Sequence, residues 1–494
     1  MSIGSETEGS WWSRPAGGRE VLQIAVPMVV TTLSVTMMNF IDSAILMSVS
    51  PTAMTAAYTA GLIWFAALSL FFGVCSYGAT FVAQYYGDDQ PEKIGPAVWQ
   101  GVWLAISFSL VVPIVQSLAP ALFAAFKHEA ELARLESLFF QILCYGAPGW
   151  LIGQSLECFY SGRGKTWVVM VVDLGAVLIN LALACMLVLG WGVESWGVPG
   201  AAWATVIAQW CRGAIYACLV LLPSNRRDFN TADCFPNLAL LRRMIRFGGP
   251  SGVQMMLDVV GFSFFVLIVG KLGVTESVAT NSTFRLSQLA FMPVWGLGMA
   301  TAILVGQKLG EDRPDLAQRA ARTTLGMSLT YMIGLSLLFI LIPRVLLEGI
   351  YFLSHEAKAE SSVAAEALTV ELMRFVSAYN IFDAAVIILV SVLRGAGDTR
   401  FVMFTSSVMA TLLVLGSYFG VNRYDLDIYG AWWFLSAWIF GLGVVYTARY
   451  RTGKWKEMRV IDQIHHAHGA PPVKKEATGL EDLETNAAPG SAGG

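Results

Sequence analysis

The chain has 494 residues, of which 55% are hydrophobic and only 14% are charged. Ordinary soluble domains carry roughly 25% charged residues, so this composition indicates a protein embedded in lipid. The net charge of −3 gives no electrostatic reason to expect nucleic-acid binding, and seven scattered Cys without CxxC spacing predict neither disulfides nor a metal site.

Residues 1–20 are polar and rich in Gly and Ser, and we expect them to form a cytoplasmic tail rather than a cleaved signal peptide. Twelve apolar runs follow. A helical span needs about 20 mostly apolar residues, because lipid offers no hydrogen-bond partners to the backbone. The sequence therefore predicts an all-α polytopic membrane protein with twelve transmembrane helices, near residues 21–47, 58–84, 97–122, 135–160, 167–190, 200–223, 244–270, 281–307, 320–347, 368–393, 401–421 and 429–450.

Two sequence motifs occur twice. The stretch QYYGDDQP at residues 84–91 recurs as QKLGEDRP at residues 307–314. The stretch GRGKT at residues 162–166 recurs in pattern as GAGDT at residues 395–399, at a slightly larger separation. Half of the chain is therefore duplicated, with about ten residues inserted between the two motifs.

Each half contains six spans, an even number, so both halves enter the membrane from the same side as parallel repeats. The tail after the last span lacks apolar periodicity, which is typical of disorder. We expect an N-terminal six-helix lobe over residues 21–223, a cytoplasmic linker over 224–243, a C-terminal six-helix lobe over 244–450 and a disordered cytoplasmic tail over 451–494.

Lys and Arg are unevenly distributed between the loops on the two sides of the membrane. Cytoplasmic loops of membrane proteins carry an excess of these residues. With the N-terminus inside, the cytoplasmic loops carry most of them, including the cluster Arg226, Arg227, Arg242, Arg243 and Arg246. The opposite side keeps only Lys127, Arg134, Lys271, Arg344, Lys358 and Arg423. We therefore place both termini in the cytoplasm.

Three acidic residues lie within predicted spans. Asp42 lies in the first span, Asp258 in the middle of the seventh and Asp383 in the middle of the tenth. An ionisable group at this depth costs roughly 2.5–3.5 kcal/mol on insertion scales and is therefore a candidate functional residue. The alternative is that each acid caps a helix, packs locally or snorkels to the interface. None of the three has an acidic counterpart in the other half.

The chemistry of a buried carboxylate suits ion-coupled transport. Burial disfavours its charged form, so it can hold a proton near neutral pH, and its oxygens can equally bind Na⁺ as hard ligands. If a cationic substrate competes for the same acid, loading one ligand expels the other, which is antiport. We predict coupling by H⁺ or Na⁺ at these acids, with no metal beyond Na⁺ at Asp258 and Asp383 and no cofactor.

Three further residues are candidate neighbours of the ion or the substrate. Tyr379 lies one helical turn before Asp383 and can offer its ring face to a cation, or serve as an interface aromatic. Asn39, three residues before Asp42, can bond that acid or its own helix. Asn180 in the fifth span is a ligand or a link between helices.

Other charges in the spans have a structural interpretation. Asp173 and Arg212 lie at neighbouring depths in the fifth and sixth spans, and we predict that they form an ion pair. Glu157, near the inner end of the fourth span, is expected to face a basic loop.

Taken together, these features resemble the multidrug and toxic compound extrusion (MATE) family, in particular its bacterial NorM-type branch. The resemblance covers about residues 19–450. It rests on the twelve spans in two parallel halves, the duplicated motifs, Pro27 and Asp42 in the first span, Asp258, and the stretch from Tyr379 to Asp383.

This resemblance implies a V-shaped pair of six-helix lobes around a central cavity, and Na⁺ or H⁺ antiport that exports cationic, often aromatic compounds. Asp42 matches the first-helix acid of the family, and Asp383 matches the acid of the tenth helix. Asp258 occupies the place of an acid that is usually Glu in this branch. Ala184 stands where relatives have a second Asn, one turn after Asn180.

We therefore predict a multidrug antiporter of the bacterial inner membrane that works as a monomer on small-molecule substrates by alternating access. The alternatives are a flippase for a lipid-linked precursor and an exporter of an endogenous metabolite on the same fold. A flippase would favour more spans and a basic cavity for its pyrophosphate headgroup. The spans contain no His/Glu cluster, Ser/His pair or phosphate-binding loop that would indicate an enzyme.

Overall fold

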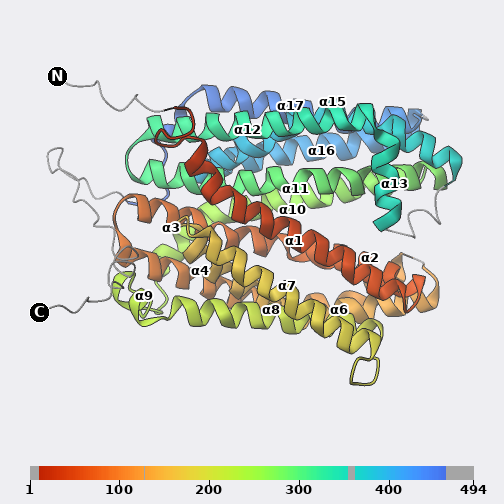
Figure 1. Cartoon of the computed structure of the whole chain (residues 1–494), viewed down its shortest axis with the longest axis horizontal. Coiled ribbons are helices and arrows are strands. Elements are labelled where there is room, and N and C mark those ends of the chain that lie inside the picture. Colours follow the sequence, from red (N-terminus) through yellow and green to blue (C-terminus); the bar gives the residue numbers. More distant parts are fainter. Residues whose placement is uncertain (1–9, 127, 354–361, 425, 463–494) are drawn as a thin grey trace, which may run out of the picture. The chain divides into compact units, whose positions relative to one another are not determined.

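The computed structural model describes residues 10–126, 128–353, 362–424 and 426–462, and all regular elements among them are helices (Figure 1). The first half contains α1 (Gly18–Met47), α2 (Pro51–Ser76), α3 (Gly78–Gly87), η1 (Pro91–Lys93), α4 (Ile94–Ser109), α5 (Val112–Ala125), α6 (Ala130–Ser161), α7 (Thr166–Leu189) and α8 (Val198–Val220). A short helix, α9 (Pro223–Asp228), follows it. The second half contains α10 (Leu238–Gly270), α11 (Val274–Gly310), α12 (Pro314–Leu341), α13 (Pro343–Leu353), α15 (Val363–Ala396), α16 (Thr399–Tyr424) and α17 (Ile428–Arg451), with η2 (Lys454–Glu457) after it.

All twelve predicted runs coincide with helices or helix pairs, which confirms the all-helical membrane fold. Ten of the described helices are long and apolar enough to cross a membrane, and the pair α4–α5, bent by 41°, would make eleven. The remaining run is α8, a helix of 23 residues. Polar side chains such as Gln209 and Arg212 lower its hydropathy.

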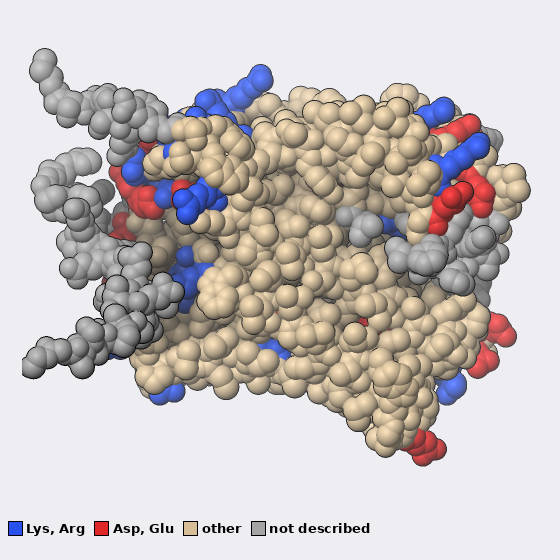
Figure 2. Space-filling model, in the orientation of Figure 1, with Lys and Arg blue, Asp and Glu red and all other residues tan. Residues whose placement is uncertain are grey.

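Charged side chains gather at the two ends of the molecule, and the broad surface between them is almost free of charge on the face that Figure 2 shows. Large apolar side chains, such as Leu110, Leu178, Phe404 and Val444, are exposed. Because exposed apolar surface of this extent is stable in lipid rather than in water, the distribution agrees with a membrane-spanning bundle.

The two halves contact each other through corresponding helices. Helix α1 packs on α11, and α2 packs on α10. The spacing of the duplicated motifs makes α1 the counterpart of α10 and α2 the counterpart of α11. A Cβ atom on Gly73 would lie 2.6 Å from the Cα of Gly252, and one on Gly296 would lie 2.8 Å from the backbone nitrogen of Val29. Gly73 and Gly296 are equivalent positions of the duplication, so the same close approach occurs twice.

The structure differs from the predicted spans in three places. The third span is broken between α4, which ends at Ser109, and α5, which begins at Val112. The second span is interrupted at Tyr77 between α2 and α3, and the ninth ends at Leu341, after which Pro343 begins the separate helix α13. Proline at the first position of a helix costs no hydrogen bond, which explains the new start at Pro343.

The predicted disordered tail over 451–494 is only partly described. Residues 463–494 lie outside the described residues. Residues 451–462 are described and differ from the prediction: Arg451 ends α17, Lys454–Glu457 form η2, and Trp455, Val460 and Ile461 are buried. Burial of these apolar side chains gives the segment a fixed place on the bundle.

Candidate functional site

Asp258 lies on α10 within a group of oxygen-bearing side chains. Gln254, one turn earlier, donates from Nε2 to Asp258 Oδ2 at 2.6 Å. Ser406 of α16 lies beside Asp258 as well, and its hydroxyl bonds Tyr446 of α17 at 3.0 Å. The Oε1 atom of Gln254 is buried and has no hydrogen-bond partner in the described protein. Three helices thus bring together a carboxylate, an amide oxygen and two hydroxyls, which are the hard ligands that suit a small cation.

Asp383 lies on α15 in a second group. Tyr379 is 5% exposed. It interacts electrostatically with Asp383 and lies within hydrogen-bond distance of Ser287 on α11. Among the described residues, no hydrogen bond joins Asp383 to Asp258, so each acid has its own neighbours. Both acids belong to the second half, in which α17 contacts both α10 and α15.

Two polar residues of these groups were missed in the sequence. Gln254 is one turn before Asp258, a spacing that could have indicated it. Asn380 is three residues before Asp383 and only 4% exposed, and its Nδ2 has no partner in the described protein. A buried amide without a partner is costly, which marks Asn380 as a further candidate ligand residue.

The candidates of the first half are more dispersed. Asp42 has a buried Oδ1 atom without a hydrogen-bond partner among the described residues. Asn39 is exposed, and its backbone carbonyl accepts a hydrogen bond from Ser43 at 2.8 Å. Asn180, 1% exposed, donates to Thr205 on α8 at 3.2 Å, which links α7 to α8. Its Oδ1 has no partner within the described part of the chain, so a role as ligand stays a prediction.

A buried ionic group joins α6, α7 and α8. Arg212 Nε donates to Asp173 Oδ1 at 2.7 Å, which confirms the predicted ion pair. Arg212 Nη2 also binds Glu157, so the expectation that Glu157 faces a basic loop is wrong. Tyr216 donates to the same Asp173 oxygen at 3.0 Å. One guanidinium offers several donors in fixed directions, which allows it to hold two carboxylates.

We expect Arg212→Gln to destabilise the protein by about 3–5 kcal/mol, because it leaves two buried carboxylates without their cation. Adding Asp173→Asn and Glu157→Gln should recover most of this loss. Chemical unfolding of the purified variants in one detergent measures the effect. Arg227→Gln is the control, because Arg227 pairs with Asp228 at the surface. A neutral triple variant as unstable as Arg212→Gln alone would contradict this explanation.

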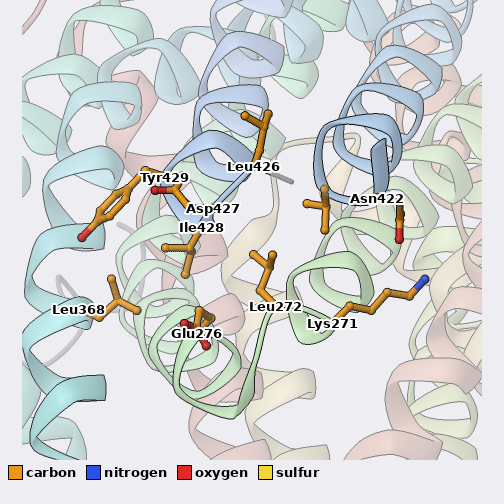
Figure 3. Close-up of a pocket in the computed structure, with 10 residues that line it drawn as sticks. Lys271, Leu272, Glu276, Leu368, Asn422, Leu426, Asp427, Ile428 and Tyr429 are labelled. Carbon is orange, nitrogen blue, oxygen red and sulfur yellow. The ribbon is translucent and has the colours of Figure 1, made fainter. Parts of the chain in front are cut away.

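A pocket of about 760 Å³ lies at the end of the second half where α10 ends and α11 begins (Figure 3). Lys271, Glu276 and Asp427 line it, together with apolar residues. No predicted site residue lines this pocket. Its lining residues Leu272 and Ile428 belong to the same apolar cluster as Tyr379, and the rings of Phe284 and Trp432 stack within that cluster at 5.2 Å.

The duplicated motifs meet at the opposite end of the molecule, which we call the motif end (residues 84–91 and 307–314). Gln84 donates from Nε2 to the carbonyl of Gly395 at 3.0 Å. Gln307 donates from Nε2 to the carbonyl of Gly162 at 2.8 Å. Each half thus uses the Gln of its first motif to bind the second motif of the other half. The duplication in the sequence becomes a pair of equivalent bonds between the halves.

The glycines of the first motif allow this contact. A Cβ atom on Gly87 would clash with the carbonyl oxygen of Gln307, and one on Gly310 would clash with that of Gln84. Asp89 and Asp312 follow with φ of 51° and 54°, a left-handed conformation that Asp tolerates. The backbone geometry where the two halves meet thus explains why the first motif has Gly at its fourth position and Asp at its sixth.

Comparisons with known proteins agree with this duplication. A family model described as MatE matches residues 27–186 and 250–419, one segment in each half. The chain is 27% identical over 430 residues to the multidrug resistance protein MdtK of Yersinia pestis (strain Pestoides F), covering 86% of this chain and 92% of the relative. The same values hold for MdtK of Proteus mirabilis (strain HI4320).

Solved structures show the same fold. A transporter of the MOP superfamily from Pyrococcus furiosus Vc1 aligns with a TM-score of 0.80 and 16% identity, over 90% of this chain and 97% of that one. An outward-facing multidrug resistance MATE family transporter aligns with a TM-score of 0.78 and 16% identity, over 89% of this chain and 97% of that one. At these identities the likeness concerns the fold.

Proposed function

Because the chain belongs to the MatE family of membrane transporters, we propose that it is a cation-coupled antiporter that exports organic cations or other xenobiotics. Its relatives in Yersinia and Proteus are named as multidrug resistance proteins, which supports this class of substrate. The chemistry is transport rather than catalysis, with Na⁺ or H⁺ as the coupling ion and no cofactor. We propose that it acts as a monomer.

The observation that carries the proposal is the group around Asp258. A carboxylate at this depth is expensive unless it binds a proton or a cation. Gln254, Ser406 and Tyr446 surround it with oxygens, and the Oε1 atom of Gln254 has no partner among the described residues. We propose that the coupling ion binds here, and that Asp383 with Tyr379 forms the second part of the site. Asp42, Asn39 and Asn180 are proposed to contact substrate or proton in the first half.

We further propose that the motif end faces the cytoplasm of a bacterial inner membrane. The linker that carries Arg226 and Arg227 contacts the start of α4, where the Gly95 N–H donates to the Phe229 carbonyl at 3.0 Å, and Arg459 after α17 pairs with Asp312 of the motif end. This distribution agrees with the positive-inside rule. Hydrogen bonds at Gln84 and Gln307 then join the halves on the cytoplasmic side. Breaking and remaking such a junction is what alternating access requires.

The test is efflux of a fluorescent organic cation from everted vesicles with an imposed Na⁺ or H⁺ gradient. We expect one of the two gradients to drive transport, and the vesicles without the protein to show none. In the same vesicles, a flipping assay with a lipid-linked precursor should remain negative. Flipping without cation transport would contradict the proposal and favour the flippase, and failure of every organic cation tested would favour export of an endogenous metabolite.

A further inference from the structure

The segment that follows α17, which we call the C-terminal strap (Gly453–Ile461), folds back onto the motif end. Trp455 anchors its start: it is 1% exposed, stacks on Tyr450 with ring centroids 5.4 Å apart, and donates from Nε1 to the Tyr450 carbonyl at 3.1 Å. Lys456 Nζ binds Gln318 Oε1 on α12 at 2.9 Å. The start of the strap is thus held by the second half.

The end of the strap reaches the first half. The backbone N–H of Val460 donates to Gln84 Oε1 at 2.8 Å, and Val460 is 1% exposed. Val460 and Ile461 belong to an apolar cluster that also contains Phe81 and Ile94 of the first half. A peptide segment attached to the second half is therefore buried against the first.

The strap also contacts both motifs of the second half. Arg459 Nη2 pairs with Asp312 Oδ1 at 3.1 Å. A Cβ atom on Gly397 would lie 2.8 Å from Val460 Cγ1, so the left-handed Gly397 leaves the room that Val460 occupies. The strap therefore lies where Gln84, Asp312 and Gly397 converge.

Both the nitrogen and the oxygen of the Gln84 side-chain amide form hydrogen bonds in this arrangement. Its Nε2 binds the Gly395 carbonyl, and its Oε1 accepts the Val460 N–H. Separation of the halves would exchange both bonds for bonds to water, and each exchange has a modest net cost. The strap thus adds a hydrogen bond, an ion pair and buried apolar contacts to the closed junction.

We propose that the C-terminal strap is a clamp that stabilises the junction of the two halves at the motif end, and that it must release before this end opens. The proposal rests on the alternating access of the proposed function. Transport rate then depends on how readily Val460 leaves Gln84, which makes the strap a point at which opening toward the cytoplasm is controlled.

Hydrogen exchange of the full-length protein, measured by mass spectrometry without substrate, tests the clamp. Two variants weaken it: Arg459→Ala removes the ion pair with Asp312, and Val460→Asp places a charge in the apolar cluster. Glu457→Ala is the matched control, because Glu457 is exposed on the same strap. The readout is residues 162–166, because separation of the halves at the Gln307–Gly162 bond would expose this segment of the first half to water.

We expect amides of residues 162–166 to exchange about two- to fivefold faster in Arg459→Ala, because its partner Asp312 is largely exposed, about tenfold faster in Val460→Asp, and at the wild-type rate in Glu457→Ala. Wild-type exchange in Arg459→Ala, with the protein normally inserted, would overturn the proposal and leave the strap as a passive cover. Arg459→Ala keeps the test decisive if Val460→Asp fails to fold. If residues 162–166 exchange faster in the clamp variants but the wild type exports no organic cation under either gradient, the proposed function is wrong and the strap is still a clamp between the halves.

Discussion

Asp258→Asn is expected to lower gradient-driven efflux by one to two orders of magnitude, roughly, while the protein inserts and folds normally. Asn has the shape of Asp, and its Oδ1 can still accept the hydrogen bond from Gln254, so the local structure should persist. The variant can neither carry a proton nor offer a charged ligand to Na⁺. A hydrogen bond or contact to a charged group contributes about 1.5–3 kcal/mol, so we expect coupled transport to fall by roughly 10- to 100-fold.

The measurement is the rate of fluorescence recovery in everted vesicles, normalised to the amount of inserted protein and repeated under Na⁺ and H⁺ gradients. Asp315→Asn is the matched control, because it makes the same chemical change at an exposed position in the first turn of α12. Asp383→Asn is expected to lose coupling as well. If Asp258→Asn and Asp383→Asn both transport at the rate of Asp315→Asn, the two acids are structural and the proposed ion site is wrong.

The helical spans could be predicted because their cause is local. A run of about 20 apolar residues must be helical in lipid whatever surrounds it, and the duplicated motifs fix the pairing of the halves in sequence. The Asp173–Arg212 pair could be predicted for a similar reason, since charges at one depth in neighbouring spans have few other partners. The third member, Glu157, depends on the direction of the Arg212 guanidinium, which spacing does not reveal.

Other features depend on contacts between distant parts of the chain. The motif Gln residues are the last residues of two predicted spans, and only the packed halves show that Gln84 and Gln307 bind across the junction. The sequence predicts a disordered tail that includes the strap, because its few apolar residues have no periodicity. Trp455, followed by the pair Val460 and Ile461, is nevertheless a signal that a short segment can bury side chains against another element.

Gln84→Ala is expected to weaken the junction of the halves more than Gln307→Ala. The two residues are equivalent in the duplication, and each binds one Gly carbonyl of the other half. Gln84 alone also accepts the Val460 N–H of the strap. Since each buried group left without a partner costs about 1–3 kcal/mol, Gln84→Ala removes about twice as much stabilisation as Gln307→Ala.

The expected result is faster hydrogen exchange at residues 395–399 in Gln84→Ala and at 162–166 in Gln307→Ala, with the larger effect in the first. Gln116→Ala provides the matched control, because Gln116 donates to the Gln141 carbonyl at 3.0 Å within the first half. That variant loses the same kind of bond but should leave both motif segments at the wild-type rate. Equal exchange in all three variants would mean that the Gln bonds do not hold the halves together. A graded response, with Gln84→Ala above Gln307→Ala and Gln116→Ala unchanged, would show that the duplicated junction has become asymmetric through the strap.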